Sequence, residues 1–268
     1  MRAVLSSSIV SSQCAKQLTW FERVNRWLGG DRAPSLLPHG LRVYAIGDIH
    51  GRLDLLDALI ARIEDDARSG PGCQILAFVG DYIDRGPDSK RVVERLLNLP
   101  ERFHAQFIRG NHDQALLDFI ADPQTYSSWK EFGAQETLWS YSVRPPKFDQ
   151  RKYTLEAHSG LIKNLPAAHL DFFQKLQPYA VIGEYFFTHA GVRPGIALNL
   201  QSHEDLMWIR DDFLASTANF GKIVVHGHSP SPHPIRRTNR IGIDTGAYAT
   251  GKLTAAVLEG SELRFLQT

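Results

Sequence analysis

The sequence contains only two cysteines, Cys14 and Cys73, among 268 residues. Two cysteines so far apart argue against a disulfide framework and favour a reducing compartment, so a cytoplasmic location is expected. No apolar run approaches the about 20 residues that a membrane-spanning helix needs, so no transmembrane segment is expected. Thirty Lys and Arg residues balance 29 Asp and Glu residues, which gives a net charge of +1. This balance provides no basic field, so no nucleic-acid partner is expected.

The first 40 residues differ in character from the rest of the chain. Residues 17–30 carry Trp, Phe, Val and Leu at helical spacing, which predicts a short amphipathic helix. Residues 29–40 have the Gly and Pro content of a linker. We therefore expect an N-terminal extension over residues 1–40. Its helix either packs on the domain or docks on a partner or membrane surface, and the sequence does not identify that partner.

From Leu41 onward, short apolar runs alternate with amphipathic segments. The apolar runs are LRVYAI, QILAFV and FHAQFI, and the amphipathic segments between them are residues 51–67 and 88–99. Runs without polar alternation are typical of strands that are covered on both faces. The order strand, helix, strand, helix therefore predicts a parallel sheet with covering helices.

The pattern changes after the third run. Residues 114–180 are mainly helical and looped, which predicts a helical insert within a domain spanning residues 41–268. Strand-like segments return in EYFFTHAG, GKIVVHGHS, RIGIDTG, LTAAVLEG and ELRFLQT. Their close spacing predicts a second, mostly hairpin-connected sheet.

Polar motifs follow five of the strand-like runs. In chain order they are GDIHG, GDYIDRG, GNHD, THAG and HGHS. In α/β sheets, ligands collect outside the carboxyl ends of strands. Asp48 and His50 are two residues apart in an extended segment, so both side chains can point at one ion. Asp81 carries two oxygens that can bridge two ions.

The other three motifs supply further donor atoms. Asn111 offers an amide oxygen, and His189 and His228 offer imidazole nitrogens. Mixed oxygen and nitrogen donors suit Mn, Fe or Zn better than Ca or Mg, with Mn the first choice. Two such ions about 3.5–4 Å apart form a hydrolytic site for phosphate esters. Each motif alone has a structural explanation, such as a turn or a core histidine, but five motifs with donors at strand ends do not.

The ordered motifs resemble those of the phosphoprotein phosphatase branch of the calcineurin-like metallophosphoesterases. The resemblance extends over residues 41 to about 258. It implies an α/β fold in four αββα layers, with a central β-sandwich flanked by helices and two metals at the sheet edge. It also implies an ion assignment, with Asp48, His50 and Asp81 on one ion and Asp81, Asn111, His189 and His228 on the other.

The same resemblance implies roles around the metals. Asp84 is expected to pair with His112, the general acid, while Arg85 and Arg109 match phosphate-binding arginines. Arg210 matches a third such arginine within a looser motif.

One position departs from the eukaryotic pattern. Eukaryotic protein phosphatases carry Glu after GNH, whereas this chain carries Asp113. Asp at this position also occurs in bacterial-type members and in dinucleoside tetraphosphatases, which weakens the inference to a protein substrate.

The expected activity is that of a bacterial-type Ser/Thr protein phosphatase. A metal-bound hydroxide would hydrolyse the phosphomonoester of a phosphoprotein or phosphopeptide. The enzyme alternative is a symmetrical dinucleoside tetraphosphatase, for which aromatic residues of the insert either stack on adenine or simply pack. Those residues are Tyr126, Trp129, Trp139 and Tyr141. A non-catalytic binding protein with a decayed site is a third possibility, although no ligand and no acid is missing.

Overall fold

A first mixed sheet is built around three parallel strands. The computed structural model describes residues 36–147 and 151–268. Within them, β1 (Leu41–Ile46), β2 (Cys73–Phe78) and β3 (His104–Phe107) pair in parallel. Antiparallel β9 (Thr254–Glu259) and β10 (Glu262–Gln267) complete the order β10-β9-β1-β2-β3.

The central strands are buried on both faces, because successive side chains point to opposite sides of the sheet. One face packs against α2 (Leu53–Ala67) and α3 (Ser89–Leu97). That face carries Tyr44, Ile46, Leu76 and Phe78. The opposite face carries Val43, Ala45, Ile75 and Ala77, and it packs against the second sheet. This two-sided burial is the reason for the unbroken apolar runs in the sequence.

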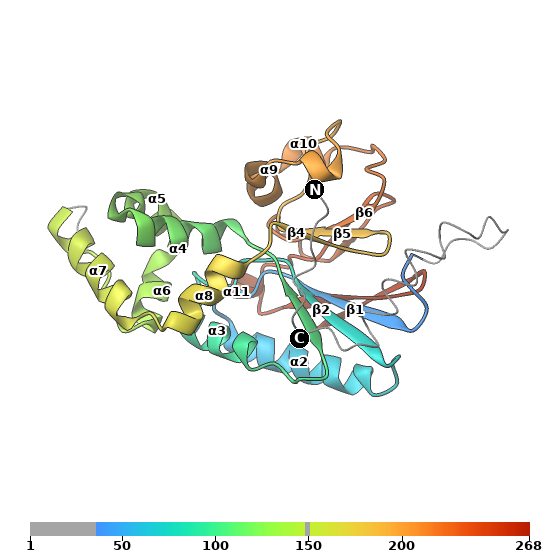
Figure 1. Ribbon diagram of the computed structural model, residues 1–268, viewed down its shortest axis with the longest axis horizontal. Helices are drawn as coiled ribbons and strands as arrows, with labels where there is room; N and C mark the ends of the chain where they lie inside the picture. The colour runs from blue at the N-terminus through green and yellow to red at the C-terminus, as the bar shows by residue number, and fades with distance from the viewer. Residues whose placement is uncertain (1–35, 148–150) are drawn as a thin grey trace.

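The second sheet has the order β4-β5-β6-β8-β7. Its strands are β4 (Tyr179–Ile182), β5 (Tyr185–Thr188), β6 (Ile223–His226), β7 (Ile235–Arg236) and β8 (Arg240–Gly242). The outer face packs on α9 (His203–Trp208) and α10 (Asp211–Leu214), through Phe186 and Val224 against Leu206 and Phe213. Figure 1 shows the resulting layers, from α2 and α3 through the two sheets to α9 and α10. This arrangement confirms the predicted β-sandwich flanked by helices.

The predicted connectivity of the second sheet was wrong. Its central strands β5, β6 and β8 are parallel, and β9 and β10 belong to the first sheet. Residues 189–222 separate β5 from β6 and carry α9 and α10, so the chain can cross over and return in parallel. After β8, α11 (Ala247–Thr250) leads across the sandwich to β9, which pairs with β1. Strand spacing alone does not reveal such a change of sheet.

Helices dominate the segment between the two sheets. They are α4 (Asn111–Ala121), α5 (Tyr126–Trp129), α6 (Ala134–Ser140), α7 (Arg151–Asn164) and α8 (Ala167–Lys175). Short 3₁₀ turns are η1 (Pro123–Thr125) and η2 (Lys130–Phe132), with η3 (Leu198–Leu200) before α9. Figure 1 shows these green and yellow helices gathered at one end of the molecule. Their apolar residues join the same core as α2 and α3. The predicted helix at residues 17–30 lies outside the described residues.

The two remaining expectations concern cysteines and membranes. The expectation on the cysteines involves Cys14, which lies outside the described residues, so it stays a prediction. In the described ranges, every helix is too short or too polar to cross a bilayer.

Candidate functional site

The five polar motifs meet at one edge of the β-sandwich. The first three follow β1, β2 and β3 of one sheet, and the last two follow β5 and β6 of the other. Hydrogen bonds join the two sets. The backbone N–H of His228 donates to Asp48 Oδ2 at 3.0 Å, and His189 Nδ1 donates to the Val79 carbonyl at 2.9 Å.

Asp81 lies at the centre of this edge. Its Oδ2 atom is 3.5 Å from His50 Nε2 and 3.4 Å from His189 Nε2. The side chain is 2% exposed, so its charge requires a buried positive partner. Asp81 would therefore be the residue shared by two ions, as the sequence predicts.

The histidines on either side of Asp81 are held in the form that binds metal. His50 Nδ1 donates to the Ile83 carbonyl at 2.9 Å, as His189 Nδ1 does to Val79. Burial lowers the pKa of His189 to about 3 and that of His50 well below its usual value. Both rings are therefore neutral, with the Nε2 lone pair directed into the site.

The contact between His189 and Asn111 tests whether a cation fits. His189 Nε2 lies 2.8 Å from Asn111 Oδ1. Because Nδ1 carries the proton of the neutral ring, two acceptor atoms face each other at this distance. A cation bound by both atoms would remove that repulsion. The residues therefore fit a divalent ion, and His228 Nδ1, 3.2 Å from His189 Nε2, adds a further nitrogen.

The structure groups the predicted ligands differently from the sequence prediction. The structure contains two groups of donor atoms, and within each group all the atoms lie within 4.8 Å of one another. One group comes from His50, Asp81 and His112, and the other from Asp81, His189 and His228. Asp48 is in neither group. Burial, Asp244 and Asp81 all raise the pKa of Asp48 well above its usual value. The assignment of Asp48 to the first ion therefore stays a prediction, and Asp244 is a buried carboxylate that the sequence reading missed.

His112 and Asp84 form the predicted pair. His112 Nδ1 lies 2.8 Å from Asp84 Oδ2, and both side chains are buried. Burial raises the pKa of Asp84 to about 7, and it lowers the pKa of His112 to about 3 with a further contribution from Arg85. The other ring nitrogen, Nε2, faces the metal edge at 3.7 Å from Asp81 Oδ2. The pair thus presents one imidazole nitrogen to the site and anchors the other.

Two of the three predicted arginines reach this edge. Arg85 Nη2 lies 3.4 Å from His112 Nε2, and its guanidinium stands 4.5 Å over the ring of Tyr248. Arg210 Nε lies 3.2 Å from His228 Nε2. Both guanidinium groups therefore lie where an anion on the metal edge would meet them.

Arg109 is placed differently. Its Nη1 donates to Gln114 at 3.0 Å, and its Nη2 donates to the carbonyls of Phe173 and Gln174 at the end of α8. Those bonds attach α8 to the loop after β3. The structure thus gives Arg109 a structural contact, and its predicted role in phosphate binding stays a prediction.

The backbone is strained at the site. Among the described residues, six that are not glycine have positive φ, and five of these belong to the motifs. They are His50, Asp81, Asp84, Arg85 and His228, with φ between 47° and 69°. Such conformations are costly for residues with a Cβ and persist where the surrounding structure enforces them. The strain indicates that side-chain direction is fixed at these positions.

Asp113 ties the second and third motifs together. Its Oδ2 accepts the backbone N–H groups of Asp81 (3.0 Å) and Gly110 (2.9 Å), and its Oδ1 accepts that of Tyr82 (3.1 Å). The carboxylate is fully buried. Asp113, where the sequence departs from the eukaryotic pattern, therefore has a structural role, because it holds the backbone of the second and third motifs together.

Replacement of Asp113 by Asn is expected to lower the free energy of unfolding by about 2–3 kcal/mol. An amide has one acceptor oxygen, and its NH₂ group would face a backbone N–H. Chemical denaturation of the two proteins measures this difference. Asp118→Asn, an exposed change on the same helix, is the control and is expected to have little effect. An Asp113→Asn protein as stable as the wild type would contradict this role.

The exposed aromatic residues beside the site are not those of the insert. Tyr126, Trp129 and Tyr141 are buried, and the exposed Trp139 contacts none of the predicted ligands among the ring contacts of the described residues. Trp208 and Tyr248 instead flank the metal edge. Their rings lie 6.0 Å from that of His228 and 5.5 Å from that of His50. Trp208 ends α9 and Tyr248 lies in α11, in segments that connect strands of the sandwich, so their place at the site could not be read from strand ends.

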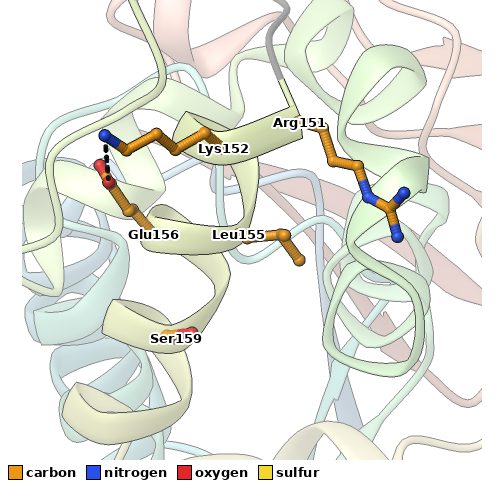
Figure 2. A pocket seen from close by; sticks show the side chains of 5 residues that line it. All are labelled: Arg151, Lys152, Leu155, Glu156 and Ser159. Atoms are coloured by element: carbon orange, nitrogen blue, oxygen red, sulfur yellow. Dashed lines mark ion pairs between the residues drawn. The ribbon is translucent and has the colours of Figure 1, made fainter.

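A separate hollow of about 680 Å³ runs along α7. Figure 2 shows its lining, in which Lys152 pairs with Glu156 at 4.0 Å while Arg151 points away toward the neighbouring helices. Leu155 and Ser159 complete the lining. None of the predicted site residues lines this hollow, and its charged groups are exposed. It is therefore distinct from the metal edge.

Comparisons with known proteins agree with this geometry. The family model described as calcineurin-like phosphoesterase matches residues 41–258. An asymmetrical bis(5'-nucleosyl)-tetraphosphatase PrpE of Anoxybacillus flavithermus is 27% identical over 231 residues, covering 78% of this chain and 87% of that protein. A protein of the same name from Bacillus mycoides is 29% identical with the same coverage.

Solved structures share the fold. A crystal structure provisionally described as a diadenosine tetraphosphatase superposes with a TM-score of 0.60 at 21% identity, covering 84% of this chain and 93% of the other. A cold-active protein tyrosine phosphatase superposes with a TM-score of 0.56 at 15% identity, covering 85% and 79%. At these identities, the superpositions show the fold alone.

Proposed function

The chain belongs to the calcineurin-like phosphoesterase family, whose members use two divalent metal ions, and we propose that it cleaves dinucleoside tetraphosphates. The chain is thus a metal-dependent phosphoesterase, with candidate His and Asp ligands gathered at one edge. The family match does not distinguish the Ser/Thr protein phosphatase branch, which the sequence favoured, from the other branches. The names of the similar bacterial proteins support a nucleotide substrate instead.

The observation that carries the proposal is the pair of exposed aromatic rings at the site. Trp208 is 40% exposed and Tyr248 is 41% exposed, beside His228 and His50 respectively. Nucleobases stack on aromatic side chains, with about 1–3 kcal/mol per base. Two rings on either side of a cationic metal edge match two bases joined by a polyphosphate.

The predicted ligands would hold the two ions, with Mn²⁺ the first choice for this donor set. When bound, the ions neutralise phosphate oxygens and lower the pKa of a water molecule. The chain's own cations complete the phosphate site, because Arg85 and Arg210 lie beside the histidines and can bind the non-bridging oxygens.

His112 supplies the proton to the leaving oxygen. A substrate phosphate is negatively charged, so it raises the pKa of the nearby imidazole and opposes the effect of burial. His112 therefore gains its second proton together with the substrate. Asp84 accepts the Nδ1–H bond, and Nε2, which faces the metal edge, gives its proton to the departing group.

The names of the relatives also bear on which bond is cleaved. The alternative that the sequence offers is a symmetrical dinucleoside tetraphosphatase, but these relatives are named asymmetrical. We propose that this chain likewise releases a nucleoside monophosphate and a nucleoside triphosphate.

A Ser/Thr protein phosphatase is the second candidate, and the acid pair favours it. A serine or threonine alkoxide is a poor leaving group that needs a proton, and His112 with Asp84 at 2.8 Å is suited to supply one. A nucleotide leaves through a phosphate oxygen, whose second pKa of about 6 makes it less dependent on acid.

The value of kcat/KM for diadenosine tetraphosphate is expected to exceed that for a phosphoserine peptide by at least about tenfold under matched Mn²⁺. Trp208→Ala is expected to raise KM for the dinucleotide by about tenfold, because one stacking contact is lost. KM for 4-nitrophenyl phosphate should stay unchanged. Trp139→Ala, which removes an exposed ring elsewhere, is the control.

Chromatography of the products identifies the cleaved bond. AMP with ATP supports asymmetrical cleavage, whereas ADP alone supports the symmetrical reaction. A tenfold preference for the peptide would replace the proposal with the protein phosphatase.

A further inference from the structure

The carboxylate of Asp84 is held by more than His112. It is fully buried and accepts two hydrogen bonds from the helical insert. Trp129 Nε1 donates to Oδ2 at 2.9 Å, and Thr137 Oγ1 donates to Oδ1 at 2.6 Å. His112 is the third partner, at Oδ2. Each oxygen of the carboxylate therefore accepts one hydrogen bond from the insert, in addition to the contact of Oδ2 with His112.

Each donor is itself fixed. Trp129, on α5, is 1% exposed and packs on Phe119 with ring centroids 5.1 Å apart. Thr137, on α6, is fully buried, and its hydroxyl oxygen also accepts the backbone N–H of Asp84 at 2.9 Å. Ser89 Oγ lies 3.0 Å from the same hydroxyl. Asp84 is thus held at both ends, in a backbone conformation with φ of 69°.

We propose that Trp129 and Thr137 are positioning residues for the proton transfer by His112. They fix the plane of the Asp84 carboxylate, and that plane fixes the direction of the imidazole and of Nε2. This inference rests on the proposed role of His112 as acid. It gives the insert a task that the sequence did not indicate, because Trp129 was expected either to stack on a base or to pack.

The chemistry determines which reactions are sensitive. Without the Trp129 N–H bond, Asp84 Oδ2 keeps only its bond to His112, and the insert holds the carboxylate through Thr137 at Oδ1 alone. A small displacement of a catalytic group is enough to slow proton transfer. The loss falls on substrates whose leaving group needs the proton, while a good leaving group departs without it. Substrate binding, which depends on the metal edge and the arginines, is unaffected.

The test compares isosteric variants on two simple substrates. Trp129→Phe keeps the buried ring without its N–H, Thr137→Val keeps the shape without the hydroxyl, and Thr137→Ser keeps the hydroxyl. Initial rates of the Mn²⁺-loaded protein are measured on phenyl phosphate and 4-nitrophenyl phosphate. Trp139→Phe, at an exposed position on the same insert, is the control.

Trp129→Phe and Thr137→Val are expected to lower kcat on phenyl phosphate by about tenfold, with KM unchanged and 4-nitrophenyl phosphate within about twofold of wild type. Thr137→Ser should restore the rate. Equal losses on both substrates would mean a structural role only, and wild-type rates for Thr137→Val would also overturn the proposal. If Trp129→Phe does not fold, the comparison of Thr137→Val with Thr137→Ser decides whether the proposal holds. Failure of the dinucleotide proposal is distinguishable, because it appears in the wild type as absent tetraphosphate hydrolysis.

Discussion

Replacement of Asp81 by Asn is expected to abolish nearly all activity and to remove at least one metal ion. Oδ2 of Asp81 is the atom that lies between His50 Nε2 and His189 Nε2. An amide NH₂ group cannot ligate a cation, and the amide carries no charge to offset two divalent ions. Since metal ions contribute several kcal/mol of charge stabilisation, a loss of at least about 10³-fold in kcat follows.

Metal analysis after Mn²⁺ saturation and gel filtration measures the ion content of both proteins. Asp171→Asn is the control, because its carboxylate is exposed and pairs only with Lys175 on α8 in the described structure. At most one ion in the wild type would contradict the dinuclear site. Two ions in Asp81→Asn would contradict the bridging position.

His112→Asn is expected to lower kcat on phenyl phosphate by roughly 10²–10⁴-fold and to leave the metal content unchanged. The loss on 4-nitrophenyl phosphate should be smaller, because that leaving group needs less protonation. Asp84→Asn should follow the same pattern more mildly, since Asp84 orients the imidazole without touching the substrate.

His112→Asn also decides whether His112 acts as the general acid or as a metal ligand. The donor atoms of His112 group with those of His50 and Asp81 within 4.8 Å, so geometry alone is compatible with a ligand. Loss of an ion from His112→Asn would assign His112 to the metal, and equal losses on the two substrates would remove it as the acid. An unchanged ion count with a leaving-group effect fits the acid.

The motif residues lie close together because they sit at strand ends. The parallel strands of both sheets end at the same edge of the sandwich, so Asp81 after β2 lies beside His189 after β5 and His228 after β6. The order of strands was harder to predict. Thr254–Glu259 has an apolar pattern that fits either sheet, and only its pairing with β1 places it.

The supporting residues could not be predicted for a different reason. Thr137 is one hydroxyl in a helix, and nothing in its neighbourhood indicates a bond to a residue 53 positions away. Arg109 follows a strand just as the ligands do, yet its guanidinium turns to the carbonyls of α8. Such contacts depend on how the insert packs, which local pattern does not encode.

The meeting of the two sheets at this edge has a consequence for how activity is acquired during folding. Asp48 and His228 touch across 180 positions of sequence, through a hydrogen bond that forms only when the sandwich has closed. Contacts so distant in sequence form late, because long loops must close first. A chain still emerging from the ribosome therefore has no hydrolytic centre until His228 has been made and packed against Asp48. In a refolding experiment, activity should return with the slowest phase, after the helices have already regained their circular dichroism.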